Sequence, residues 1–298
     1  MVDAKMLNKI SSAPGFIAAL DQSGGSTPGA LRLYGIPDNE YQGDEEMFRL
    51  MHAMRVRIMS APAFTGEKII AAILFERTMD GEVDGQAVPS YLWEKRGIVP
   101  LLKVDKGLLP EENGVQVLKP MPDLDTLLAR GRDKGIFGTK MRSVIANADR
   151  TGIAAVVKQQ FEVARQIIGN GLVPIVEPEV SIKSPTKAEA EDILRDEIAK
   201  QLDLLPAGET VVLKLTLPTV ADHYAPLIAH KSVVRVVALS GGYSRADACE
   251  KLSHNHGMIA SFSRALTENL RVTMSNAEFD TSLAETIDEI YAASVNKA

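Results

Sequence analysis

The chain has 298 residues, of which 45% are hydrophobic and 24% charged, and this composition excludes disordered and collagen-like proteins. The net charge of −6 provides no basic field for nucleic acid, and no apolar run approaches the ~18 residues of a membrane helix, so we expect a small-molecule partner. A single cysteine, Cys249, excludes an internal disulfide and a cysteine metal cluster, and predicts a reducing compartment, the cytoplasm.

Short runs of β-branched and aliphatic residues recur along the chain, and each predicts a buried strand. Stretches with helical periodicity separate these runs. The predicted strands cover residues 16–20, 69–75, 99–104, 136–141, 173–176, 211–215, 233–239 and 258–262. Eight strands alternating with helices predict an α/β protein with a (β/α)8 TIM barrel, formed by residues 1–298 as one domain. A doubly wound open sheet would give the same alternation and remains the alternative.

The intervening helices carry start signals. Residues 44–59 predict the first outer helix, after an extended loop. Thr151 is predicted to open a later helix, and Thr186 with Glu189 has the spacing of a capping box. Ser244 is predicted to open a helix of the C-terminal part.

Charged residues follow or end most of the predicted strands, where barrels of this kind carry their catalytic groups. Asp21 ends the first strand. Residues two apart in a strand face the same side, so three charged pairs are expected to point toward one site. These pairs are Lys103 with Asp105, Lys140 with Arg142, and Glu177 with Glu179. Any one pair could be a solvated loop, but their repetition predicts an active site.

Lys214 stands alone among apolar residues in the sixth predicted strand. A buried ammonium group either pairs with carboxylates or loses its proton, and a neutral amine attacks carbonyl groups. Positive charges from Lys140 and Arg142 would favour the neutral amine, and Glu177 or Glu179 could move protons as acid or base. The alternative is a lysine whose stem follows the strand while its head reaches solvent.

Two Gly-Gly loops are candidate anion sites, because backbone N–H groups can approach a phosphate closely where side chains are absent. One loop follows the seventh strand, where barrels often bind phosphate, and the other follows the first strand. The first candidate comprises Ser240, Gly241, Gly242 and Arg264, and the second comprises Ser23, Ser26 and Lys103. Two anion sites flanking a lysine suggest a bisphosphate carbonyl compound.

These residues closely resemble the class I (Schiff-base) fructose-bisphosphate aldolase family, across nearly the whole chain and in the form of its bacterial branch. The matching stretches include Ala-Leu-Asp21-Gln-Ser-Gly-Gly-Ser, Lys140-Met-Arg142, Val-Pro-Ile-Val-Glu177-Pro-Glu179, Val-Leu-Lys214, Leu-Ser240-Gly-Gly and Ser261-Phe-Ser-Arg264. The resemblance implies a cytoplasmic lyase of glycolysis that cleaves fructose 1,6-bisphosphate to dihydroxyacetone phosphate and glyceraldehyde 3-phosphate without a metal or other cofactor. It implies no nucleic-acid or membrane partner.

The resemblance also implies roles for single residues. Lys214 would form the Schiff base, Glu177 would be the main acid/base, and Glu179 would orient the lysine. Asp21 and Lys140 would handle the C4 hydroxyl. Ser240, Gly241 and Arg264 would hold one phosphate, and Ser23, Ser26 and Lys103 would hold the other. Gly242 and Arg142 would be further substrate or phosphate contacts.

Three points remain open at this stage. The sequence lacks the terminal tyrosine of the animal form, and Tyr291 is interpreted as an ordinary helix residue. A metal-dependent aldolase or isomerase is one alternative, supported by His254 and His256, although we interpret these histidines as residues of a helix surface. A barrel that binds without catalysing is the other alternative.

Overall fold

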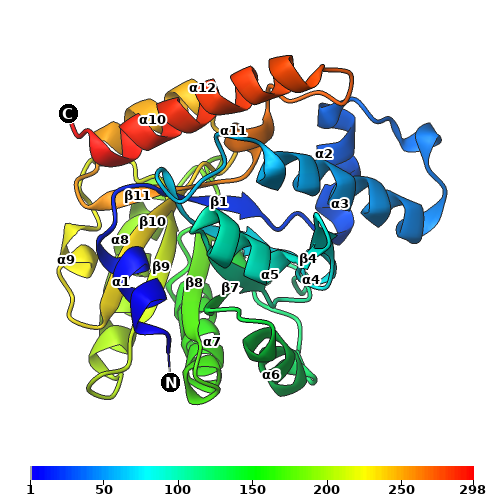
Figure 1. Ribbon diagram of the computed structural model, residues 1–298. Helices are drawn as coiled ribbons and strands as arrows, with labels where there is room; N and C mark the ends of the chain where they lie inside the picture. Colours follow the sequence, from blue (N-terminus) through cyan, green and yellow to red (C-terminus); the bar gives the residue numbers. More distant parts are fainter. Residues whose placement is uncertain (1) are drawn as a thin grey trace.

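The eight apolar runs form eight parallel strands, and these close into a barrel surrounded by helices in the computed structural model, which describes residues 2–298 (Figure 1). The strands are β1 (Phe16–Leu20), β2 (Ile69–Leu74), β5 (Val99–Lys103), β7 (Gly138–Ile145), β8 (Val173–Val180), β9 (Val211–Thr216), β10 (Val233–Leu239) and β11 (Met258–Phe262). Each pairs in parallel with the next of this series, and β11 pairs back with β1. The prediction of a (β/α)8 barrel is confirmed, and the open-sheet alternative is wrong.

Two strands extend further than the sequence predicts. β7 begins at Gly138 and continues to Ile145, and β8 continues to Val180, so both run through their charged residues instead of ending before them. Arg142 and Glu177 are register partners within this parallel pair. The charged residues that were predicted to end these strands therefore lie on the inward face of two continuous strands, because alternate residues of a strand share a face.

The outer layer consists of helices of very different lengths. They are α1 (Ala4–Ser12), α2 (Thr27–Tyr34), α3 (Gly43–Ser60), α4 (Glu76–Met79), α5 (Val88–Ser90), α6 (Leu124–Asp133), α7 (Arg150–Gly169), α8 (Lys187–Asp203), α9 (Ala225–Ile228), α10 (Arg245–Ser253), α11 (Arg264–Thr267) and α12 (Asn276–Val295). Short additional elements are η1 (Gly24–Ser26), η2 (Asp38–Glu40), η3 (Tyr91–Lys95), β3 (Glu82–Val83), β4 (Gln86–Ala87) and β6 (Val115–Gln116). Figure 1 shows α12 lying along α10 on one side of the barrel. The segment before α3 is not an extended loop as predicted, because η1, α2 and η2 occupy it.

The helix starts agree only in part with the predicted signals. Ser244 caps α10 by accepting a hydrogen bond from the Asp247 N–H, as expected. α7 is capped by Asp149 and not by Thr151. α8 does begin after Thr186, but no capping box forms there, because the Thr186 hydroxyl accepts the Ala148 N–H at 2.9 Å and joins the starts of two helices.

Two apolar clusters divide the core. The larger cluster lies between the strands and the outer helices, and the smaller fills the barrel itself. Met6 and Ile10 of α1 belong to the smaller cluster with inward residues such as Ile17, Ile175 and Val212, so α1 covers the N-terminal end of the barrel. The charged residues of β7, β8 and β9 are thereby left at the C-terminal end.

None of the helices in the part of the chain that the structure describes combines the length and the hydropathy that a membrane-spanning helix needs.

Candidate active site

Lys214 lies on β9, on the same face as Val212, which belongs to the cluster inside the barrel. The residue is only 4% exposed, so its head does not reach solvent along the strand. Its Nζ lies 3.0 Å from Oε1 of Glu177 on β8. The lysine has therefore found a carboxylate partner, which is how a buried ammonium group is compensated.

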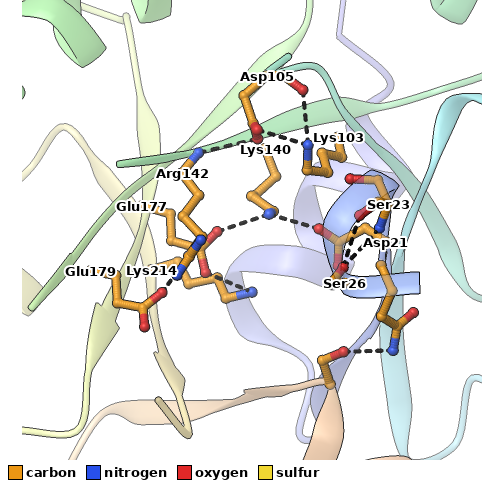
Figure 2. A network of polar contacts seen from close by, with 12 residues as sticks. Asp21, Ser23, Ser26, Lys103, Asp105, Lys140, Arg142, Glu177, Glu179 and Lys214 are labelled. Atoms are coloured by element: carbon orange, nitrogen blue, oxygen red, sulfur yellow. Dashed lines mark hydrogen bonds and ion pairs between the residues drawn. The ribbon is translucent and has the colours of Figure 1, made fainter. Parts of the chain in front are cut away.

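Glu177 connects Lys214 to a second buried lysine. Its Oε2 lies 3.0 Å from Nζ of Lys140, and the same Nζ lies 2.7 Å from Oδ2 of Asp21. Figure 2 shows this chain of Lys214, Glu177, Lys140 and Asp21, which gathers four neighbouring charges from β9, β8, β7 and the end of β1. The contact of Glu177 Oε2 with Lys140 is an ion pair without hydrogen-bond geometry, and within residues 2–298 this oxygen has no other hydrogen-bond partner.

The charges of this chain shift the proton affinities of its ends. Burial alone would raise the pKa of Asp21, but the nearby ammonium groups of Lys140 and Lys214 outweigh it and hold this pKa well below its usual range. Burial alone would lower the pKa of Lys140, but Asp21 and Glu177 raise it above its usual value. Near neutral pH, Asp21 is thus a carboxylate and Lys140 an ammonium group.

A helix residue fixes the backbone of Glu177. The Gln160 side chain of α7 donates to the Glu177 carbonyl at 3.1 Å and accepts from its N–H at 2.9 Å. Gln160 is fully buried, and the residue after Glu177 is Pro178, which has no N–H to donate. The Gln160 side-chain amide therefore satisfies the backbone N–H and carbonyl of Glu177 within β8.

A second set of charges surrounds this chain. The Arg142 side chain forms an ion pair with Glu179, and the Arg142 backbone N–H donates to Asp105 Oδ2 at 3.3 Å. Asp105 also pairs with Lys103 at 2.7 Å. Burial would lower the pKa of Arg142, but Glu179 outweighs it and raises this pKa. Glu179 thus contacts Arg142, whereas Glu177 is the carboxylate that contacts Lys214. A role for Glu179 in orienting Lys214 therefore stays a prediction.

The structure brings the first predicted anion site together. A Cβ on Gly242 would lie 3.8 Å from Nη1 of Arg264, and α10 begins just beyond this loop. Gly241 and Gly242 have φ angles of 60° and 112°, and a Cβ on Gly241 would lie 2.7 Å from the Ile182 side chain. Only glycine fits there. Ser240 precedes them and is buried.

The second predicted anion site is only partly assembled. Ser23 precedes the single turn η1, and Ser26 is its last residue. The Ser23 N–H donates to the Ser26 hydroxyl at 3.1 Å, and this hydroxyl donates to the Ser23 carbonyl at 3.0 Å. A Cβ on Gly24 would meet open space. Lys103 contacts Asp105, and within residues 2–298 no hydrogen bond joins it to either serine.

Sequence reasoning missed two buried polar residues, Gln160 and Arg55. Arg55 of α3 is 2% exposed and donates to the Gln22 carbonyl, beside Asp21. A signal was available, because Arg55 stands four residues after Met51 on the stripe of α3 that also carries Met47 and Ile58. Gln160 likewise shares the apolar face of α7. A polar residue on such a stripe is a candidate for a structural or positioning role.

The remaining predictions concern residues away from this site. His254 caps the C-terminus of α10, and His256 lies in the following turn with Nδ1 2.9 Å from Oδ2 of Asp222. The prediction that both histidines lie on a helix surface is therefore wrong. Within residues 2–298, no group of three or more His, Cys, Asp or Glu side chains is arranged to hold a metal ion. Tyr291 is a half-buried residue of α12 that packs on the main core, as predicted.

Comparison with known proteins identifies a relative over nearly the full length of the chain. The family model "Fructose-bisphosphate aldolase class-I" matches residues 5–200. A fructose-bisphosphate aldolase class 1 from Synechocystis is 59% identical over 291 residues, which cover 98% of this chain and 97% of that protein.

Two solved structures share the fold at low sequence identity. The fructose-bisphosphate aldolase of Plasmodium falciparum, solved with TRAP and a small-molecule inhibitor, superposes with a TM-score of 0.79 at 21% identity over 99% of this chain and 95% of that one. A protein from Corynebacterium glutamicum superposes with a TM-score of 0.56 at 12% identity over 97% and 92%. With the family match and the 59% identical relative, the conclusion is that this chain belongs to the class I fructose-bisphosphate aldolase family.

Proposed function

We propose that this protein is a lyase that reversibly cleaves fructose 1,6-bisphosphate to dihydroxyacetone phosphate and glyceraldehyde 3-phosphate through an imine on Lys214. The observation that carries the proposal is the position of Lys214, which is buried inside the barrel with its Nζ 3.0 Å from Glu177 Oε1. An amine beside a carboxylate that can remove and return its protons is equipped to attack a ketone and expel water.

Imine formation needs a proton relay at Lys214. Glu177 takes the ammonium proton, the freed amine attacks the ketose carbonyl carbon, and a C–N bond forms while the carbonyl π electrons move to oxygen. A further proton passes from this nitrogen to that oxygen, and Glu177 then protonates the hydroxyl, which leaves as water. Glu177 is within reach because Gln160 fixes its backbone. The resulting iminium withdraws electrons from the neighbouring carbon.

Cleavage then uses the other end of the same charge chain. Asp21, held as a carboxylate by Lys140, accepts the C4 hydroxyl proton, the C3–C4 bond breaks, and its electron pair moves into the iminium to give an enamine. The aldehyde product carries the new carbonyl group away. Protonation of the enamine carbon and hydrolysis of the imine release dihydroxyacetone phosphate and restore Lys214.

The phosphates are assigned to the two Gly-Gly loops. Arg264, beside Gly242, supplies positive charge to one loop, and Lys103 supplies it near the other. We further propose that the whole chain acts as one domain in the cytoplasm, since its single cysteine fits a reducing compartment. Burial, with a contribution from Glu289, raises the pKa of Cys249 to about 12, which is typical of an unreactive structural thiol.

Borohydride reduction tests the imine directly. Incubation with dihydroxyacetone phosphate and borohydride is expected to add one three-carbon phosphate to the protein, on the peptide that contains Lys214. Peptide mass spectrometry locates the adduct. An adduct on Lys140 or Lys103 would contradict the assignment.

Chelation tests whether a metal ion takes part. A sample dialysed against EDTA is expected to keep its full cleavage rate, because the iminium, and not a metal ion, withdraws the electrons. Activity lost on chelation and restored by zinc would instead support a metal-dependent lyase.

Replacing Arg264 with alanine is expected to lower kcat/KM for phosphorylated ketoses by roughly one to two orders of magnitude, since a charge-assisted contact to phosphate is worth about 1.5–3 kcal/mol. Arg264 is exposed and forms no ion pair with any residue of the range 2–298, so its removal leaves no buried charge behind. Steady-state kinetics on a ketose without that phosphate provide the comparison. An equal loss on both substrates would show that Arg264 is structural.

A further inference from the structure

Gln22 joins the loop of one candidate phosphate site to the Arg264 segment of the other site. It lies between Asp21 and Ser23 at the end of β1, and its Nε2 donates to the Ser263 hydroxyl at 2.8 Å. Ser263 directly precedes Arg264 at the end of β11, the strand that pairs with β1. This single hydrogen bond therefore links the loop that carries Ser23 and Ser26 to the segment that carries Arg264.

Arg55 fixes the orientation of this link. Its Nη2 donates to the Gln22 backbone carbonyl and lies 3.3 Å from the Gln22 Oε1, and its Nη1 donates to the Thr78 hydroxyl at 2.7 Å. Because a guanidinium group only donates, it holds the oxygen of the Gln22 amide and turns the NH2 group toward Ser263. The oxygen of the Gln22 amide thus contacts Arg55, and its nitrogen donates to Ser263.

The residues that the structure describes compensate the charge of Arg55 only in part. The side chain is fully buried, it forms no ion pair with any residue between 2 and 298, and its Nε lacks a hydrogen-bond partner there. Burial lowers the pKa of Arg55 to about 10, although Asp21 offsets part of this effect. A buried cation without an ion-pair contact is costly, so stability alone does not explain its presence.

We propose that Gln22 is a positioning residue that fixes the spacing of the two phosphate loops, that Arg55 holds Gln22 in place, and that this link favours ketoses with a phosphate at both ends. The inference rests on the proposed function and adds a determinant of substrate preference to it. A ketose with one phosphate occupies one loop, so its binding does not depend on the distance between the loops. A bisphosphate must fit both loops at once, and it benefits when they are already positioned.

A double-mutant cycle tests the link. In Gln22→Met and in Ser263→Ala, the ratio of kcat/KM for fructose 1,6-bisphosphate over that for fructose 1-phosphate is expected to fall about three- to tenfold, the value of one hydrogen bond, through a higher KM for the bisphosphate. In the double variant this ratio is expected to fall no further than in either single variant, because both substitutions remove the same hydrogen bond. Ser253→Ala, on the surface of α10, is the matched control.

Arg55→Met provides an independent arm. Methionine keeps an unbranched side chain and removes the buried charge, so the melting temperature is expected to stay or rise while the substrate ratio falls as in Gln22→Met. A lower melting temperature with an unchanged ratio would show that Arg55 is only structural, and would overturn its part of the proposal. Should Arg55→Met fail to fold, the cycle on Gln22 and Ser263 still decides whether the link exists.

Borohydride trapping separates this inference from the proposed function. If the wild type forms the adduct on Lys214 but the ratio is unchanged in Gln22→Met and Ser263→Ala, the positioning role is wrong and the lyase assignment stands. Additive losses in the double variant would show two unrelated contacts and would also overturn the link. If the wild type forms no adduct, the proposed function itself fails.

Discussion

Lys214→Arg is expected to lower kcat for fructose 1,6-bisphosphate cleavage by about three orders of magnitude or more, because covalent catalysis is lost and not merely weakened. Arginine retains the positive charge, but its guanidinium group stays protonated and cannot attack a carbonyl. The contact with Glu177, now 3.0 Å from the lysine Nζ, could therefore persist while the chemistry is lost. Steady-state kinetics and borohydride trapping, which should give no adduct, check the result.

Lys231→Arg is the matched control, since Lys231 is exposed in the turn before β10, and it should retain the activity of the wild type. Arginine is larger than lysine, and Lys214 is buried. A second variant, Lys214→Met, therefore removes the amine without adding volume and should be equally inactive. Circular dichroism and thermal unfolding establish that both variants fold. Substantial activity in either folded variant would exclude Lys214 as the imine-forming residue.

Glu177→Gln is expected to lower kcat by about 10²–10⁴-fold, the usual range for the loss of a general acid/base. The amide keeps the size of the side chain but cannot take a proton from Lys214 or protonate the departing hydroxyl. It also leaves the ammonium groups of Lys140 and Lys214 without the carboxylate that lies 3.0 Å from each. The rate of borohydride-trapped adduct formation should fall together with kcat, which distinguishes slow imine formation from weak binding.

The neighbouring carboxylate discriminates between two descriptions of the site. Glu179 is two residues further along β8 and pairs with Arg142, so Glu179→Gln is expected to reduce adduct formation less than Glu177→Gln does. A larger effect at Glu179 would mean that this carboxylate serves Lys214 during the reaction, as the resemblance to the family implies. Glu250→Gln, at an exposed position of α10, controls for the loss of a carboxylate elsewhere.

The barrel was predictable because its strands are buried on both faces. β1, β10 and β11 have the predicted limits, since β1 and β11 are apolar runs and the apolar run of β10 is interrupted only by Arg235. β7 and β8 were predicted too short because their charges, Arg142 and Glu177 among them, lie on the inward face of strands that continue past them. Hydrophobic periodicity cannot distinguish a charge that ends a strand from one that is buried and paired within it.

The site shows the same limit. The pairs spaced two residues apart identified Lys140 and Glu177 correctly as neighbours of one site, because strand geometry fixes which face they share. The partner of each charge depends on rotamers and on residues from other elements. Sequence reasoning therefore could not assign Glu177 to both lysines, or find that Gln160 and Arg55 hold the backbone around them.

The helix at the N-terminal end of the barrel determines the path of water during the reaction. Met6 and Ile10 of α1 pack into the apolar cluster inside the barrel beneath Lys214, together with Ile17 and Ile175. Under the proposed mechanism, the water that hydrolyses the imine must therefore enter from the side on which the sugar binds. A bound bisphosphate shields its own imine from premature hydrolysis, and departure of the aldehyde opens the route. Under this mechanism the aldehyde leaves first, because the three-carbon phosphate stays bonded to Lys214 until water hydrolyses the imine.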